Sequence, residues 1–220
     1  GTLMLIQADA TANTGIGAGQ VFENDVALTR MWAAGAPGED GLVPVAAAME
    51  LLPATLPLKH PIPIVLTLPA GMSPARVGIY HRTAREGPWD FVSERFDSSA
   101  HAFTGEAATA GEFGLLRDDT PPAVRVRPPA RRAPAGPYPR WELAAEVRER
   151  GSGVAARASH FRVDGVQVPT EWDEARQLLR WRPLAPPAPG RHAWELVVED
   201  HAGLRTVRSG SFVLDSAGHR

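Results

Sequence analysis

The chain has 220 residues, 44% of them hydrophobic, and a formal net charge of −2, which excludes wholesale disorder and gives no reason to expect nucleic-acid binding. It has no cysteine, so a disulfide scaffold, a thiolate zinc site and a cysteine nucleophile are excluded. The 21 prolines and 21 glycines exceed the usual shares of about 5% and 7%, and favour many short strands joined by turns.

The start, GTLMLIQADA, has no basic region followed by an apolar stretch and a cleavage site, so we expect a mature or excised sequence. No apolar run reaches the roughly 18 residues of a membrane span. The first clear pattern is VPVAAAMELL, residues 43–52. Its residues favour a helix, but Pro44 and Pro53 limit any helix to about two turns, and we therefore favour a strand.

The next segments alternate apolar and polar residues, as half-buried strands do. IPIVLTLP, residues 62–69, predicts a strand whose inward face carries Ile62, Ile64, Leu66 and Leu68. Pro63 indicates that this strand lies at an edge or begins there, because proline has no amide donor. Residues 77–82 and 89–95 predict a hairpin, since the glycine-containing loop TAREGP lies between them.

The stretch LLRDDTPPAVRV, residues 115–126, predicts a domain boundary. Residues 112–116 have the pattern of a closing strand, whereas residues 118–122 cannot continue a ladder because prolines lack the donor. Val124 and Val126 then restart the alternation. We therefore expect an all-β protein with two tandem β-sandwich-like domains, residues 1–118 and 119–220. The proline-rich stretch at residues 127–140 should form an exposed loop.

The second half repeats the same alternation in RWELAAEVR, residues 140–148, and HAWELVVED, residues 192–200. The side chains expected to point inward are Trp141, Leu143, Ala145, Val147, Trp194, Leu196 and Val198. Between these segments RVDGVQV carries Asp164-Gly165, a dipeptide that tolerates positive φ at both centres of a type I′ turn. A tight hairpin is predicted there.

Two resemblances follow from these segments. LTLPAGMSPARVGIYHRTAREGPWDFV, residues 66–92, followed by GEFGLLRDDTPP, residues 111–122, resembles the β-rich domain shared by ankyrins, netrin receptors and zonula occludens proteins, which bacterial surface proteins also carry. This resemblance covers residues 56–122. Residues 123–217 resemble a bacterial immunoglobulin-like domain, through RERGSGV, FRVDGVQVP and PGRHAWELVVEDHAGLRT. Leu204 stands where that family usually has asparagine, so we expect the side-chain bond that closes this turn to be missing.

Together the two domains resemble accessory regions of bacterial envelope and secreted proteins. The resemblance implies a non-catalytic spacer or interaction module, located outside the cytoplasm, that is a monomer and needs no cofactor. The alternative is the cell-wall- or carbohydrate-binding tail of a zinc peptidoglycan endopeptidase, whose catalytic domain would lie outside these residues. The partner would be a cell-wall polymer or another protein. A third possibility is that copies of this chain pair with each other through exposed sheet edges.

No catalytic, cofactor-binding or metal-binding residue is predicted. Some relatives of the first domain cut their own backbone at a his-phe-ser tripeptide, where this chain has Glu112, Phe113 and Gly114, so we expect no self-cleavage. GSG at residues 151–153 is not a serine-hydrolase elbow, and GIGAG at residues 15–19 lacks the spacing of a phosphate-binding loop. The seven histidines, at positions 60, 81, 101, 160, 192, 201 and 219, show no zinc-site spacing, although strands could bring distant ones together.

Three further features have both a functional and a structural interpretation. Asp118, Asp119 and Asp200 could gather calcium, but linker aspartates also cap turns. The arginines at positions 125, 127, 131 and 132 could touch an anionic cell-wall polymer, but the first two also suit the solvent face of a strand. Trp32 and Trp172 could stack on a sugar, whereas the other four tryptophans fit apolar faces.

Overall fold

The computed structural model describes residues 6–8, 29–32, 41–51, 57–84, 86–130, 141–185 and 187–215. Regular structure in these residues is β-strand, apart from one 3-10 turn, η1, at Glu174–Arg176. The expected all-β fold is therefore confirmed. No helix in the described ranges has the length and hydropathy of a membrane span. The chain divides into two compact units, residues 1–120 and residues 121–220, called below the first and the second domain.

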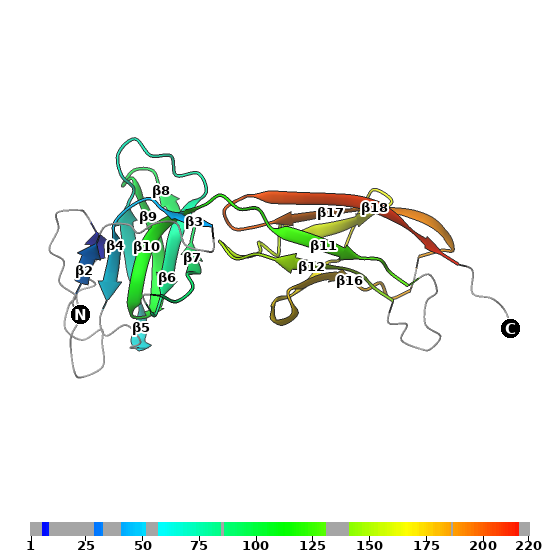
Figure 1. Ribbon diagram of the computed structural model, residues 1–220, viewed down its shortest axis with the longest axis horizontal. Coiled ribbons are helices and arrows are strands. Elements are labelled where there is room, and N and C mark those ends of the chain that lie inside the picture. The colour runs from blue at the N-terminus through cyan, green and yellow to red at the C-terminus, as the bar shows by residue number, and fades with distance from the viewer. Residues whose placement is uncertain are drawn as a thin grey trace. The chain divides into compact units, whose positions relative to one another are not determined.

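The first domain is a sandwich of two sheets (Figure 1). One sheet has the order β1-β5-β9-β8, formed by Ile6–Ala8, Pro57–Thr67, Ala102–Thr109 and Phe96–Asp97. The other has the order β2-β4-β10-β6-β7, formed by Thr29–Trp32, Ala48–Leu51, Gly111–Asp118, Val77–Arg82 and Asp90–Ser93. The short strand β3, Leu42–Pro44, also pairs with β10.

Alternate residues along β5 fill the core of this sandwich, as predicted. Ile62, Ile64, Leu66 and Leu68 are all buried, in one cluster with residues of β9 and β10 such as Phe103 and Phe113. Pro63 lies inside the strand and not at its start. In the described residues β1 pairs with residues 64–66 of β5, whereas Pro63 pairs with Glu106 of β9. The described part of β1 therefore does not need an amide donor from the proline.

Two more local predictions for the first domain are confirmed. Where this segment is described it forms the strands β3 and β4 and not a helix: both strands pair with β10, and the backbone amide of Val45 between them donates to the Leu115 carbonyl at 2.9 Å. The predicted hairpin exists as well: β6 pairs antiparallel with β7, with an irregularity in register between Ile79 and Tyr80.

The second domain consists of two four-stranded sheets (Figure 1). The order β11-β12-β16-β15 is formed by Ala123–Arg127, Leu143–Arg148, Leu178–Trp181 and Glu171–Asp173. The order β14-β13-β17-β18 is formed by Val166–Val168, His160–Val163, Gly190–Glu199 and Arg205–Leu214. If the strands are lettered A, B, C, C′, D, E, F and G in chain order, the sheets are ABED and C′CFG, which is the arrangement of an immunoglobulin-like sandwich. The immunoglobulin-like expectation for this domain is confirmed.

The inward faces of β12 and β17 are also the predicted ones. Trp141, Leu143, Ala145, Val147, Leu196 and Val198 are all buried, and Trp194 is half-buried against the same core. Trp194 stands opposite Gly210 of β18, where an added Cβ would lie 2.6 Å from the Cζ2 atom of the indole. The glycine therefore provides the space in which the indole lies.

The tight hairpin at Asp164-Gly165 is confirmed by its backbone angles. Asp164 has φ 51° and Gly165 has φ 81°, and the turn joins β13 to β14 through the pair Val163 and Val166. Positive φ at both central residues is the signature of a type I′ turn, whose twist matches that of the flanking strands.

Candidate functional site

The tripeptide at residues 112–114 lies on β10, and each of its residues is engaged in packing or pairing. Glu112 is 4% exposed, and its Oε2 accepts a hydrogen bond from Arg82 Nε at 2.6 Å. Phe113 is fully buried in the main core. A Cβ added at Gly114 would lie 3.1 Å from a methyl carbon of Leu116 and 3.4 Å from Trp89 Cη2. The position at which a cleaving relative has serine is thus a packing glycine.

The face of this sheet on which Gly114 lies carries a small second core that the sequence did not predict. Leu42, Tyr80 and Leu116 are buried together under Trp89 and Phe91, and the guanidinium carbon of Arg82 lies 4.3 Å from the centre of the Trp89 ring. The available signal was VGIYHR, in which four consecutive residues are buried. A strand that is buried on both faces shows a continuous apolar run instead of alternation.

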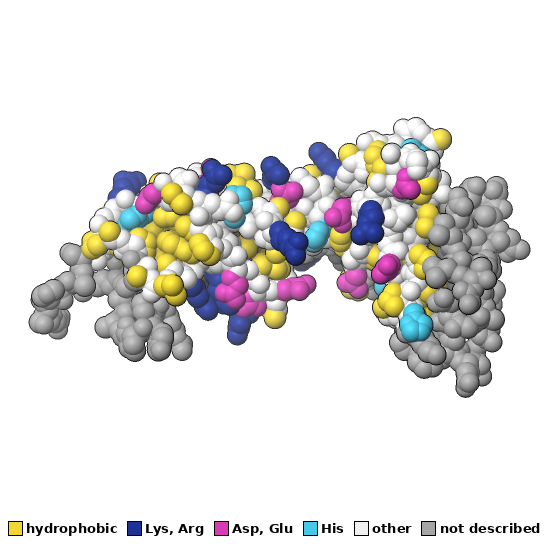
Figure 2. All heavy atoms as spheres, turned by 180° about the vertical axis from the view of Figure 1, so that it is seen from behind, with side chains coloured by type: hydrophobic (Ala, Val, Ile, Leu, Met, Phe, Trp, Pro, Cys, Tyr) yellow, Lys and Arg dark blue, Asp and Glu magenta, His cyan; other side chains and the backbone are white. Residues whose placement is uncertain are grey.

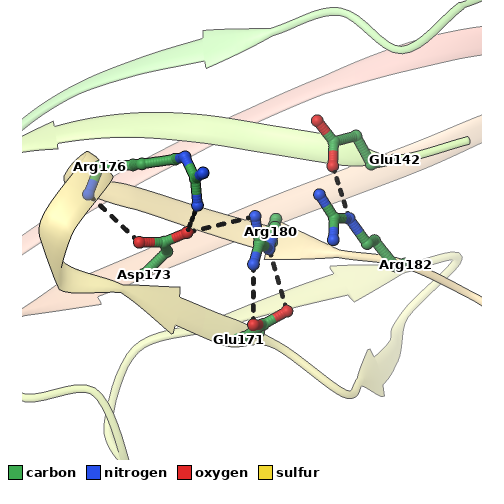
Figure 3. A network of polar contacts seen from close by, with 6 residues as sticks. All are labelled: Glu142, Glu171, Asp173, Arg176, Arg180 and Arg182. Atoms are coloured by element: carbon green, nitrogen blue, oxygen red, sulfur yellow. Dashed lines mark hydrogen bonds and ion pairs between the residues drawn. The ribbon is translucent and has the colours of Figure 1, made fainter. Parts of the chain in front are cut away.

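In the second domain, arginines and carboxylates of β15, η1 and β16 form a network of ion pairs (Figure 3). Arg180 binds Glu171 through two hydrogen bonds, of 2.9 and 2.8 Å, and its Nη1 lies 3.4 Å from Asp173 Oδ2. Asp173 also accepts from Arg176 Nη1 at 2.8 Å. The hydrogen bonds that they accept lower the pKa of Glu171 and of Asp173, and the hydrogen bonds that Arg180 donates to Glu171 raise the pKa of Arg180.

Further pairs extend across β12 and β11 of the same sheet. Arg182 Nε donates to Glu142 Oε2 at 2.8 Å, and Arg127 Nε donates to Glu146 Oε1 at 2.8 Å (the first pair is drawn in Figure 3). The hydrogen bond from Arg127 lowers the pKa of Glu146. Because every one of these arginines has a carboxylate partner, this surface stabilises the sheet internally and presents little unpaired charge to a ligand.

These ion pairs make the predicted basic cluster a weaker candidate for binding an anionic polymer. Arg125 and Arg127 lie on the exposed face of β11, while Val124 and Val126 of the same strand pack against the core, as the structural interpretation expects. Arg127 is bound to Glu146. The arginines at positions 131 and 132 lie outside the described residues.

A carboxylate-imidazole contact joins the type I′ turn to β17. One oxygen of Asp164 is 2.6 Å from His192 Nδ1, and the other accepts the Ala193 amide at 2.9 Å. The second ring nitrogen of His192 lies 2.8 Å from the Ala188 carbonyl, and the ring stacks on Phe212. The bond to Asp164 raises the pKa of His192, and the same bond lowers the pKa of Asp164, because both favour the charged forms.

The aspartates considered for calcium make local contacts. Asp118 Oδ1 accepts the Thr120 amide at 3.0 Å, which is the turn-capping geometry. Asp119 accepts from Arg117 Nε at 2.8 Å and lies 3.5 Å from Arg76 Nη1. These contacts match the structural interpretation of the two residues.

The turn after β17 is closed in a way that the sequence analysis did not expect. Asp200 Oδ1 accepts the Leu204 amide at 2.8 Å, and the Asp200 amide donates to the Leu204 carbonyl at 3.1 Å. The expectation that no side-chain bond closes this turn is therefore wrong, because the Asp200 carboxylate closes it. Glu149, which the sequence analysis did not consider, has a carboxylate oxygen within 4.8 Å of one from Asp200.

The remaining predicted candidates have structural roles where they are described. Ser152 of the GSG segment is buried and accepts the Ala202 amide at 3.0 Å. Trp172 is half-buried against the core. Within the described ranges no histidine belongs to a convergent group of three or more ligand-type side chains. The side chain of Trp32 and the GIGAG segment lie outside what the structure describes.

One open hollow on each domain is lined by described residues. One, of about 210 Å³, lies over Trp141 and the residues that follow β11, and another, of about 370 Å³, lies beside Arg76, Arg117 and Asp119. Figure 2 shows basic and acidic side chains interspersed on the face that it draws, together with a patch of apolar side chains on the second domain. Interspersed charges of both signs do not create the wide single-sign field that steers a polyanion.

Comparison with known proteins assigns no family. No family model matches the chain, and no curated protein sequence matches it. Among solved structures, the fibronectin(III)-like modules of CbhA from Clostridium thermocellum are similar to it, with a TM-score of 0.35 and 14% sequence identity. The match covers 88% of this chain and 98% of that chain.

Proposed function

We propose that this chain is a non-catalytic accessory module of a bacterial envelope or secreted multidomain protein, located outside the cytoplasm and monomeric in dilute solution. The observation that carries the proposal is that each domain is a sandwich with its own filled core. Such bodies resist deformation, because interiors are close-packed, and can therefore act as a spacer or present an interaction surface. We include in this proposal that residues 56–122 form a domain of the kind shared by ankyrins and netrin receptors.

The chemistry of the described residues supports a role without catalysis. The side chains that could have served as nucleophile or base at positions 112, 114 and 152 are a paired carboxylate, a glycine and a hydroxyl bound to a backbone amide. A nucleophile needs a neighbouring base within hydrogen-bond reach. The ion-paired side chains of the second domain satisfy one another, including Arg127 and Glu142, which line the hollow over Trp141.

The test is an assay of the purified chain with insoluble peptidoglycan. We expect no release of soluble fragments and no retention of the protein on the pellet. A hydrolytic activity that a single substitution in this chain abolishes would refute the proposal.

The alternative, a cell-wall-binding tail of a zinc peptidoglycan endopeptidase, is favoured by one observation, the exposed arginine face of β11. It predicts retention on the pellet, competition by soluble glycan, and loss of retention in Arg125→Ala. The matched control is Arg157→Ala, an exposed arginine outside the strands. If salt leaves retention unchanged, the arginine face is not the binding surface, because contacts between exposed charges weaken with ionic strength.

Self-cleavage is tested separately. We expect the chain to run as a single band on a denaturing gel, because Gly114 has no hydroxyl. Two fragments that divide near residue 113 would contradict this.

A further inference from the structure

The last strand of the second domain, β18, is a long edge strand that no proline or bulge interrupts. It pairs with β17 over ten consecutive residues, from Gly190 with Leu214 to Glu199 with Arg205, and no register shift interrupts the ladder. Among the described strands it is the last in its sheet, and seven of its ten residues are exposed. Edge strands are normally blunted by shortness, proline, lysine or bulges.

The other described edges of this domain are protected. β14 and β15 have three residues each, and β11 has five and is followed by Pro128 and Pro129. β18 contains neither proline nor lysine; its two charged side chains are Arg205 and Arg208, and Arg208 Nη1 donates to the Val207 carbonyl at 3.0 Å. Two of the four exposed large apolar side chains in the described residues, Val207 at 51% and Val213 at 43%, lie on this strand.

Both valines lie on the outer face of the sheet. The inward residues of β18 include Thr206, Phe212 and Leu214, which are buried, and residues two apart share a face. The outer face therefore carries Arg205, Val207, Ser209, Ser211 and Val213, and the alternation extends to the exposed Asp215.

This outer face is complementary to itself in one antiparallel register. If two β18 strands pair about a two-fold axis at Gly210, Val207 stands opposite Val213, Ser209 opposite Ser211, and Arg205 opposite Asp215. Every pair then matches apolar with apolar, hydroxyl with hydroxyl, or opposite charges, and such cross-strand pairs stabilise a sheet. A shift of the axis by one residue along the strand places Arg205 opposite Val213, or Val207 opposite Asp215.

We propose that two copies of this chain pair through β18, antiparallel and with the axis at Gly210, to form a continuous sheet across the dimer. The interface is isologous, because the same strand contributes both sides. The pairing is concentration-dependent and goes beyond the proposed accessory function, which does not require it. The Arg205 guanidinium also binds Glu199 through Nε at 2.5 Å, and its remaining donors can serve a second carboxylate.

The absence of native cysteine allows a direct test of the register. Ser209→Cys and Ser211→Cys are made as two separate proteins, because these positions stand opposite each other only between chains. On oxidation the mixture should form the mixed disulfide dimer faster than either protein alone forms its own dimer. Equal rates in all three samples would overturn the register, because they would indicate random collision.

Sedimentation of the unmodified chain tests the pairing itself. The average mass should rise toward that of a dimer between micromolar and millimolar protein. Val207→Lys should abolish this rise, while Val166→Lys, an exposed valine on β14, should leave it intact. Both variants should unfold at the same temperature as the parent, since both side chains are on the surface. A monomer at every concentration, or equal effects of the two variants, would refute the proposal.

Discussion

At the scale of single residues, Asp164 shows how one carboxylate connects a turn to a strand. Its φ of 51° is set by the type I′ turn, which places its two oxygens on His192 and on the Ala193 amide of β17. The turn was predictable from the dipeptide Asp-Gly. Its histidine partner, 28 residues further along, was not, because that contact depends on β13 pairing with β17.

The Asp164-His192 contact predicts a pH-dependent stability. The pKa of His192 is raised above its usual 6.5, so the contribution is fully present below pH 6.5 and is lost as the pH rises through the higher folded value. The pKa of Asp164 is lowered below 3.8, so its contribution is present above 3.8 and is lost at more acidic pH. The parent should therefore melt at a higher temperature than His192→Gln, and the difference should be largest between pH 3.8 and pH 6.5. The difference should shrink toward alkaline pH.

A double-mutant cycle is the control for this assignment. Asp164→Asn combined with His192→Gln should be less destabilising than the sum of the single substitutions, because the second change then has no partner to lose. Additive effects at pH 5 and at pH 9 alike would show that the two side chains do not stabilise each other.

Gly210 provides a second prediction at this scale. Gly210→Ala places a methyl group 2.6 Å from the Trp194 ring, so the indole must move, and we expect a loss of about 1–3 kcal/mol in the free energy of unfolding. The matched control is Ser209→Ala on the neighbouring position, whose side chain lies on the other face of β18. Urea unfolding measures both. If Gly210→Ala is as stable as Ser209→Ala, then Trp194 does not lie against β18 as described.

At the scale of elements, alternation decided which side of each strand is buried. β17 illustrates it: Leu196 and Val198 are fully buried, whereas Val197 between them is only half-buried. Alternation did not predict β10, where residues 111–116 are buried on both faces. On the second face of that sheet Trp89 and Phe91 pack against Leu116 of β10, and their position depends on β7 pairing with β6 at the edge of the sheet.

The two faces of β17 can be compared by matched truncations. We expect Leu196→Ala to lower the free energy of unfolding by about 2–5 kcal/mol, because it removes a fully buried side chain and leaves a cavity. Val197→Ala on the same strand should cost less, since part of that side chain already contacts solvent. The comparison uses denaturant midpoints at equal m-values. Equal losses at the two positions would contradict the inward orientation of Leu196.

At the scale of the whole molecule, the chain forms two bodies with separate cores. Sandwiches of about 100 residues bury enough surface to fold alone. In the second domain the buried Thr206 hydroxyl donates to the Pro122 carbonyl at 2.6 Å, so the residues just before β11 belong to this body. The segment from Pro121 onward therefore contains all the described strands of the domain.

We expect residues 121–220 to fold by themselves and to unfold in one cooperative thermal transition with a near-ultraviolet dichroism signal. The comparison protein, residues 128–220, lacks β11, which exposes the edge of β12 and leaves Thr206 without its acceptor. It should melt at a lower temperature or fail to fold. Equal melting temperatures would mean that β11 adds nothing to this sandwich.

The sequence by itself determined the all-β fold, the inward faces of β5, β12 and β17, and the turn at Asp164-Gly165. These features are local, because side-chain direction alternates residue by residue and turn angles depend on two adjacent residues. Only the tertiary structure decided which distant charges meet, such as Arg82 with Glu112 and Arg182 with Glu142, and that β18 is left at an edge. The physical reason is that strand order depends on pairing between segments far apart in the chain, which no local pattern encodes.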